Sequence, residues 1–128
     1  MNTNAELPDF IVGDSRRIIV TLEHLPADVL IYEAWFTVRD SKVAADPGIF
    51  QKFITTSSFV GQGLIIDNGS DNTIGQALLR FDIETEDSAL LTEGTMYYYD
   101  IRVRTSFDTV NTIEVGTIVP IWGATAHP

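Results

Sequence analysis

The sequence predicts an all-β domain, an antiparallel sandwich of about seven or eight strands with one short helical turn. Three observations lead to this fold class. Apolar and polar residues alternate in short runs, which is the period of a strand with one buried face. Asp, Asn, Gly and Pro separate these runs at intervals of about a dozen residues. The intervals offer no helices of the length that crossovers between parallel strands require.

Four runs in the N-terminal half are predicted to form strands, at residues 9–12, 16–22, 33–39 and 50–55. In the second and third runs apolar residues occupy every second position, so they share one face of the strand. The sequence Asp46-Pro47-Gly48 cannot continue a strand ladder. Residues 40–48 are therefore interpreted as a connection.

Four runs in the C-terminal half are predicted to form strands, at residues 64–66, 76–83, 95–105 and 112–121. The first two flank the polar segment 67–72, where Asn68-Gly69 favours a tight hairpin turn because both residues readily adopt positive φ. A helical turn is expected at 85–91, with Thr85 as its cap. The last run is expected to place five residues on one face: Ile113, Val115, Thr117, Val119 and Ile121.

A chain of 128 residues is expected to form one domain, because single cores commonly occupy about 100–200 residues. The sandwich is predicted at residues 8–122, between a flexible N-terminus at 1–7 and a flexible tail at 123–128. Sheet edges need protection against pairing with other chains. We interpret Arg39, Lys52 and Pro120 as residues that protect them.

The charge balance excludes two classes of partner. The chain has 18 Asp and Glu residues against 8 Lys and Arg, a formal net charge of −10. Nucleic acids and anionic membrane surfaces are bound through Lys and Arg, so we expect neither as a partner. Many of the acids fall in turns and on outward strand positions, where they favour solubility.

The chain contains no cysteine, which removes a disulfide framework, thiol catalysis and thiolate metal sites. The first residues have no signal-peptide pattern, and no stretch reaches the roughly 18 apolar residues of a membrane span. We therefore expect the protein to be made and assembled in a cytoplasm.

One motif suggests a nucleophile. Gly13-Asp14-Ser15 after an apolar run is similar to the nucleophile block of GDSL esterases. Those enzymes also need an aspartate three residues before a histidine near the C-terminus, and Ala124 precedes His127 here. Gly, Asp and Ser favour turns by themselves, so a turn is the expected structure.

The other polar motifs also have plain interpretations. His24 and His127 have no partner at a metal-ligand spacing. The segment 67–72 lacks the glycine and the glutamate of a calcium-binding loop. The acids between Glu84 and Glu93 are interpreted as a solvated turn. We expect no catalytic residue, no metal ion and no cofactor.

The candidate interface residues are Trp35, Tyr98, Arg39 and Thr37. Strand parity turns Trp35, Thr37 and Arg39 away from the face of Phe36, and turns Tyr98 away from the face of its two tyrosine neighbours. A Trp or Tyr on a sandwich surface can anchor a protein interface. The alternative is that the connection at 40–48 covers the Trp35 and Tyr98 rings.

A set of short motifs appears in a fixed order: Gly13-Asp14, Ile18-Ile19-Val20-Thr21-Leu22, Ala34-Trp35-Phe36-Thr37-Val38-Arg39, the run 77–83, Leu90-Leu91-Thr92-Glu93-Gly94-Thr95, Tyr99-Asp100-Ile101-Arg102-Val103 and Gly116-Thr117-Ile118-Val119. In this order and spacing, residues 8–121 resemble the N-terminal immunoglobulin-like domain of phage baseplate upper proteins and related tail and fibre-associated domains. The resemblance implies an immunoglobulin-like sandwich and a structural role without catalytic residues.

The first hypothesis is a phage or prophage virion component, made in the host cytoplasm. It would contact other virion proteins and form a homo-oligomer through strand edges and the surface of Trp35 and Tyr98. The alternative is a carbohydrate-binding module for attachment to a host surface, which an exposed row of Trp35 with tyrosines would favour. A third hypothesis, hydrolysis by Ser15, predicts loss of esterase activity in a Ser15→Ala variant.

Overall fold

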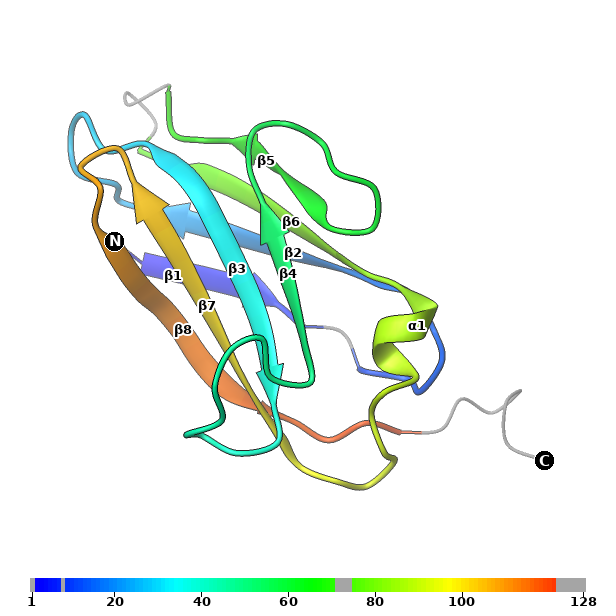
Figure 1. The fold of residues 1–128 in the computed structure, drawn as a ribbon. Coiled ribbons are helices and arrows are strands. Elements are labelled where there is room, and N and C mark those ends of the chain that lie inside the picture. The colour runs from blue at the N-terminus through cyan, green and yellow to red at the C-terminus, as the bar shows by residue number, and fades with distance from the viewer. Residues whose placement is uncertain (1, 8, 71–74, 122–128) are drawn as a thin grey trace.

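Two four-stranded antiparallel sheets pack face to face and enclose the core (Figure 1). The structure is a computed structural model that describes residues 2–7, 9–70 and 75–121. Its elements are β1 (Asn2–Glu6), β2 (Arg16–Glu23), β3 (Ile31–Arg39), β4 (Phe50–Ile54), β5 (Gly63–Asp67), β6 (Ala77–Ile83), α1 (Thr85–Ser88), β7 (Tyr97–Thr105) and β8 (Val110–Ile118). The predicted all-β sandwich with one short helical turn is confirmed.

The strand order is β1-β2-β6-β5 in the first sheet and β4-β3-β7-β8 in the second. Every neighbouring pair is antiparallel. This order is that of immunoglobulin-like sandwiches, with β4 added beside β3. The second sheet therefore has β3 and β7 at its centre and β4 and β8 at its edges.

The core is centred on a cluster of aromatic rings from both sheets. Phe36 of β3 is fully buried. Its ring centroid lies 5.7 Å from those of Phe81 and Tyr99 and 6.4 Å from those of Phe10 and Phe50. The alternating side chains of β2 and β6 complete the core from the first sheet.

The N-terminal segment differs from the prediction in two places. Residues 2–6, expected to be flexible, form β1 and pair with β2. They are mostly polar, so the backbone ladder holds them at the sheet edge, with Ala5 packed against the core. Residues 9–12, expected as a strand, make an isolated parallel bridge between Ile11 and Ile121. The apolar residue Phe10 of this segment is instead buried in the core.

β8 also differs from its predicted bounds and faces. It ends at Ile118, and its pairing with β7 shifts at Ile113, which is the extra residue of a β-bulge. A bulge displaces the alternation by one residue. As a result Val115 and Thr117, expected on one face with Ile113, point outward and are exposed, whereas Ile118 is buried.

The helical turn is shorter than predicted, and its N-cap lies one residue earlier. Glu84 is the N-cap of α1, where the sequence suggested Thr85. The backbone N–H of Glu84 donates to Asp87 Oδ2 at 2.9 Å, which stabilises the first turn. After Ser88 the chain tightens, because Leu91 N–H donates to the Ser88 carbonyl oxygen three residues back.

The three residues interpreted as edge protection occupy different positions. Arg39 lies on β3, a central strand, so that interpretation of it was wrong. Lys52 lies on the edge strand β4 with its side chain turned inward, and inward charges are a known device against edge pairing. Pro120 is buried beyond the end of β8.

β5 and β6 pair as antiparallel neighbours, as predicted, but residues 68–76 separate them, so the tight turn predicted at Asn68-Gly69 was wrong. Of these two residues, Gly69 has a positive φ and Asn68 does not. Asp67 Oδ1 and Asn68 Oδ1 accept hydrogen bonds from the backbone N–H groups of Gly69 and Ser70, at 2.9 and 3.1 Å. These oxygens thus serve the local turn. The rest of that segment, at 71–72, and the tail predicted at 123–128 lie outside the described residues.

Candidate functional site

The four candidate interface residues lie on one surface, which we call the outer face. It is formed by the side chains of the second sheet that point away from the core: Glu33, Trp35, Thr37, Arg39, Gln51, Phe53, Tyr98, Asp100, Arg102, Arg104, Val110, Thr112, Val115 and Thr117. On it Arg39 is the cross-strand partner of Tyr98, and Thr37 is the partner of Asp100. Trp35 lies on the same side of β3, two residues before Thr37.

The candidates differ in exposure. Thr37 and Arg39 are buried, whereas Trp35 and Tyr98 are half-buried. Trp35 packs against Phe53 of β4, with 5.4 Å between ring centroids. A partner on the outer face would therefore contact Trp35 and Tyr98, while Thr37 and Arg39 lie beneath other groups.

The connection at residues 40–48 covers Arg39 through a network of charges. Arg39 Nε donates to Asp100 Oδ2 at 3.0 Å, Nη2 donates to Asp46 Oδ1 at 2.5 Å, and Nη1 donates to the Ala44 carbonyl at 2.7 Å. Arg102 Nη2 donates to the second oxygen of Asp46 at 2.6 Å. Asp46 thus joins the connection to both β3 and β7. The connection therefore covers Arg39, whereas the alternative raised by the sequence concerned the Trp35 and Tyr98 rings.

Asp46 is expected to make stability depend on pH in the acid range. Hydrogen bonds from Arg102 and Arg39 lower the pKa of Asp46 from its usual 3.8. A carboxylate with a lowered pKa in the folded state stabilises the fold above its unfolded pKa, and this stability is lost as the pH falls through the folded pKa. Thermal melts of Asp46→Asn should therefore change less with pH than wild-type melts below about pH 4.

Asp40→Asn is the matched control for this experiment, because Asp40 is an exposed acid on the same connection. It should keep the wild-type pH profile. Equal profiles for Asp46→Asn and the wild type would contradict the bridging role of Asp46.

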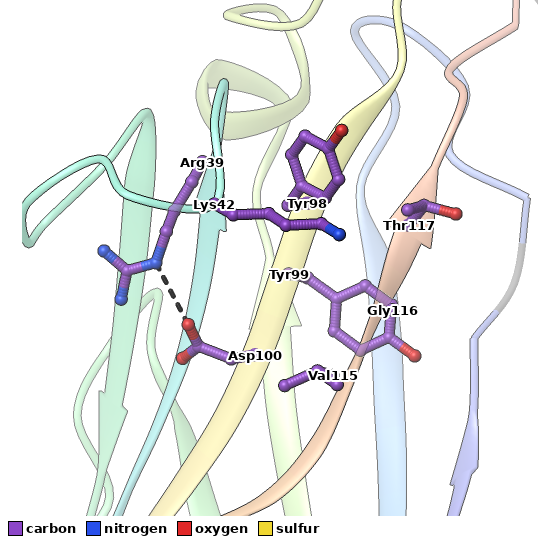
Figure 2. Close-up of a pocket in the computed structure, with 8 residues that line it drawn as sticks. All are labelled: Arg39, Lys42, Tyr98, Tyr99, Asp100, Val115, Gly116 and Thr117. Carbon is purple, nitrogen blue, oxygen red and sulfur yellow. Dashed lines mark hydrogen bonds and ion pairs between the residues drawn. The ribbon is translucent and has the colours of Figure 1, made fainter.

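A hollow of about 370 Å³ lies beside this network, between β7, β8 and the connection (Figure 2). We call it the Tyr98 hollow, and its lining residues are Arg39, Lys42, Tyr98, Tyr99, Asp100, Val115, Gly116 and Thr117. Lys42 Nζ lies 5.5 Å from the centroid of the Tyr98 ring, a cation–π contact.

Tyr99 fixes the strand that borders this hollow. A Cβ atom at Gly116 would lie 2.6 Å from the Tyr99 ring, so glycine is needed for the ring to pack against β8. The Tyr99 hydroxyl donates to Glu114 Oε2 at 3.0 Å. Burial and this hydrogen bond together raise the pKa of Tyr99. The phenol therefore stays protonated and keeps β7 and β8 in register.

The exposed side of β8 was not among the surfaces predicted from the sequence. Its outward residues, which we call the β8 stripe, are Val110, Thr112, Val115 and Thr117. Val110 is 56% exposed and Val115 is 70% exposed. Gly116 was the available signal, because a glycine inside a strand pattern often marks a bulge or a close approach of two segments.

The remaining motifs lie apart from this surface. Gly13, with φ of 83°, and a hydrogen bond from Asp14 N–H to the Ile11 carbonyl form a turn before Ser15. His24 is in the loop after β2, and His127 is outside the described residues. In the described ranges no three His, Asp or Glu side chains form a group that could hold a metal ion.

Residues 2–7, 9–70 and 75–121 contain no helix long and apolar enough to cross a membrane. A scan of protein-family models and a search of curated proteins both find no match to this sequence. What is established is the architecture, a two-sheet antiparallel β-sandwich.

Proposed function

We propose that the chain is a non-enzymatic structural or adaptor protein of a phage or prophage virion, associated with a tail, baseplate or fibre. In this role it assembles with other virion proteins and with copies of itself. The observation that carries the proposal is the β8 stripe at an open sheet edge. The resemblance of residues 8–121 to baseplate-associated domains supports the same role.

β8 has the properties of a strand that can pair with another chain. It is nine residues long, and β7 is its one ladder neighbour among the described strands. Its outward residues are all Val or Thr, which favour the extended conformation. A long edge strand with uncharged outward side chains is a template for strand addition.

On the opposite side of the sandwich, hydrogen bonds between β4, β5 and the segments beside them cover the sheet edges, and β8 has fewer such bonds. There Ile65 N–H donates to the Thr55 carbonyl at 2.8 Å, which links β5 to the segment after β4. Phe53 N–H donates to Gln62 Oε1 at 3.0 Å. On the β8 side, Thr3 Oγ1 donates to the bulge carbonyl of Ile113 at 3.1 Å. Among the described residues this is the one hydrogen bond that links β8 to the other sheet, so β8 is the more accessible edge.

Self-assembly through β8 is tested by a lysine on the stripe. We expect wild-type protein to show a mass above that of the monomer in size-exclusion chromatography with light scattering, and Val110→Lys to shift it to the monomer. A lysine on an edge strand opposes pairing by charge and by its hydration.

Val60→Lys is the control, since Val60 is fully exposed in the loop between β4 and β5. It should assemble like the wild type. A monomeric wild type at every concentration would contradict self-assembly. The virion role predicts tail, baseplate or fibre genes beside this gene, and their absence would count against it.

The carbohydrate-binding alternative depends on exposed rings that lie in a row. Trp35 packs on Phe53, and the Thr37–Asp100 rung separates it from Tyr98. This arrangement does not favour a platform for a sugar ring. Binding to a glycan array that Trp35→Ala abolishes would nevertheless favour the alternative over the assembly role.

A further inference from the structure

The Tyr98 hollow combines an apolar wall with one available cation. Tyr98 and Val115 supply the ring and the apolar side chain, and Thr117 supplies a hydroxyl (Figure 2). Figure 2 shows the Lys42 side chain extending across β7 beside the Tyr98 ring. Lys42 is exposed, so its ammonium group can meet a ligand at the mouth of the hollow.

Lys42 is unusual among the cations of this acidic protein. The other seven Lys and Arg residues all form ion pairs with carboxylates of the chain: Arg16, Arg17, Arg39, Lys52, Arg80, Arg102 and Arg104. Within the described ranges, Lys42 is the one that has no carboxylate partner. Its contact is the Tyr98 ring.

The two arginines beside the hollow, Arg39 and Arg102, do not compete with Lys42 for a ligand. Arg39 and Arg102 are matched by Asp46 and Asp100, so the network beside the hollow has no net charge. Three nitrogen atoms of Arg39 already donate to Asp100, Asp46 and Ala44. Repulsion from distant acids is largely screened beyond about 8–10 Å in physiological salt. Among the described residues, Lys42 is thus the one cation of the lining whose charge is not matched by a carboxylate partner.

We propose that the Tyr98 hollow binds the C-terminal residue of a partner protein. The apolar side chain of that residue lies against Tyr98 and Val115, and its terminal carboxylate pairs with Lys42. The inference rests on the proposed assembly role, which supplies the partner, and it adds the chemical group that the partner presents.

Size and charge both favour this occupant. The hollow, at about 370 Å³, is near the lower end of the roughly 300–1,000 Å³ of ligand pockets, which suits one residue better than a large cofactor. A C-terminal residue carries an apolar side chain and a carboxylate on the same Cα atom. It therefore matches an apolar wall and a single cation at the rim without needing a second site.

A pair of small probes tests the proposal by NMR. N-acetyl-L-phenylalanine carries the carboxylate of a chain end, and N-acetyl-L-phenylalaninamide replaces it with a neutral amide of the same shape. We expect the carboxylate probe to shift the backbone amide signals of Tyr98 and of residues 115–117. Its affinity should be about two- to fivefold higher than that of the amide, the range of an exposed ion pair.

Two variants separate the carboxylate contact from the apolar contact. Lys42→Gln should bind both probes equally, because it removes the cation and leaves the wall. Tyr98→Ala should weaken both probes. Arg17→Gln is the control for the charge change, since Arg17 is exposed on β2 in the other sheet. It should keep the wild-type preference for the carboxylate.

Equal affinity of the wild type for the two probes would overturn the proposal, as would shifts confined to other surfaces or no saturable shift at all. The titration needs no assembly. A monomeric wild type that still prefers the carboxylate would contradict self-assembly alone. An oligomer that does not distinguish the probes would contradict only the capture of a C-terminal residue.

Discussion

Phe36→Ala is expected to reduce the free energy of unfolding by about 3–5 kcal/mol, the usual effect of removing a buried aromatic ring. The ring is fully buried and contacts rings from both sheets, so its loss leaves a cavity that the sheets cannot close. Domains of this kind have total stabilities of about 5–15 kcal/mol, so much of the protein's margin would be lost. Urea denaturation should show a lower midpoint with an unchanged slope.

Phe59→Ala is the matched control, because Phe59 is 48% exposed in the loop after β4. Its unfolding free energy should change by less than about 1 kcal/mol. A loss below about 2 kcal/mol for Phe36→Ala would contradict its place at the centre of the core. Phe36→Ala also removes a ring that supports the outer face, because the Phe36 ring stacks on Tyr99 beside the Tyr98 hollow.

The strands that could be predicted are those whose side chains alternate between core and solvent. β2, β6 and β7 bury every second residue over most of their length, so their pattern is visible in the sequence. In β3 the apolar residues Ala34, Phe36 and Val38 alternate in the same way, although Thr37 and Arg39 are buried as well. β1 has no such pattern, because a short edge strand is held mainly by its ladder with β2. At β8 the bulge at Ile113 breaks the period, and period-two reasoning then assigns the wrong face.

The candidate site was predictable in part for the same reason. Parity alone places Trp35, Thr37 and Arg39 on one side of β3. It does not reveal that Arg39 is buried, because that depends on Asp46 folding back onto Arg102, 56 positions along the chain. The Tyr98 hollow also needs residues from three segments, and their proximity follows from the tertiary fold.

Asp87→Ala is expected to reduce the free energy of unfolding by about 3 kcal/mol, because it leaves a buried ammonium group without its counterion. The Lys52 side chain is 4% exposed and pairs with Asp87 of α1. Its Nζ also donates to the Gly61 carbonyl at 2.6 Å, a neutral acceptor that does not balance the charge. The pair thereby ties α1 and the loop before β5 to the edge strand β4.

The sharper test of this pair is rescue by a second substitution. Lys52→Met keeps the length of the side chain and removes its charge, so the double variant Lys52→Met/Asp87→Ala buries no ion. We expect it to be more stable than Asp87→Ala alone, as found when buried ion pairs are replaced by apolar groups. Glu86→Ala, on the exposed side of the same helical turn, should change stability by about 0.5 kcal/mol or less. If the two single losses simply add in the double variant, Lys52 and Asp87 are not coupled, and α1 is held to β4 by packing alone.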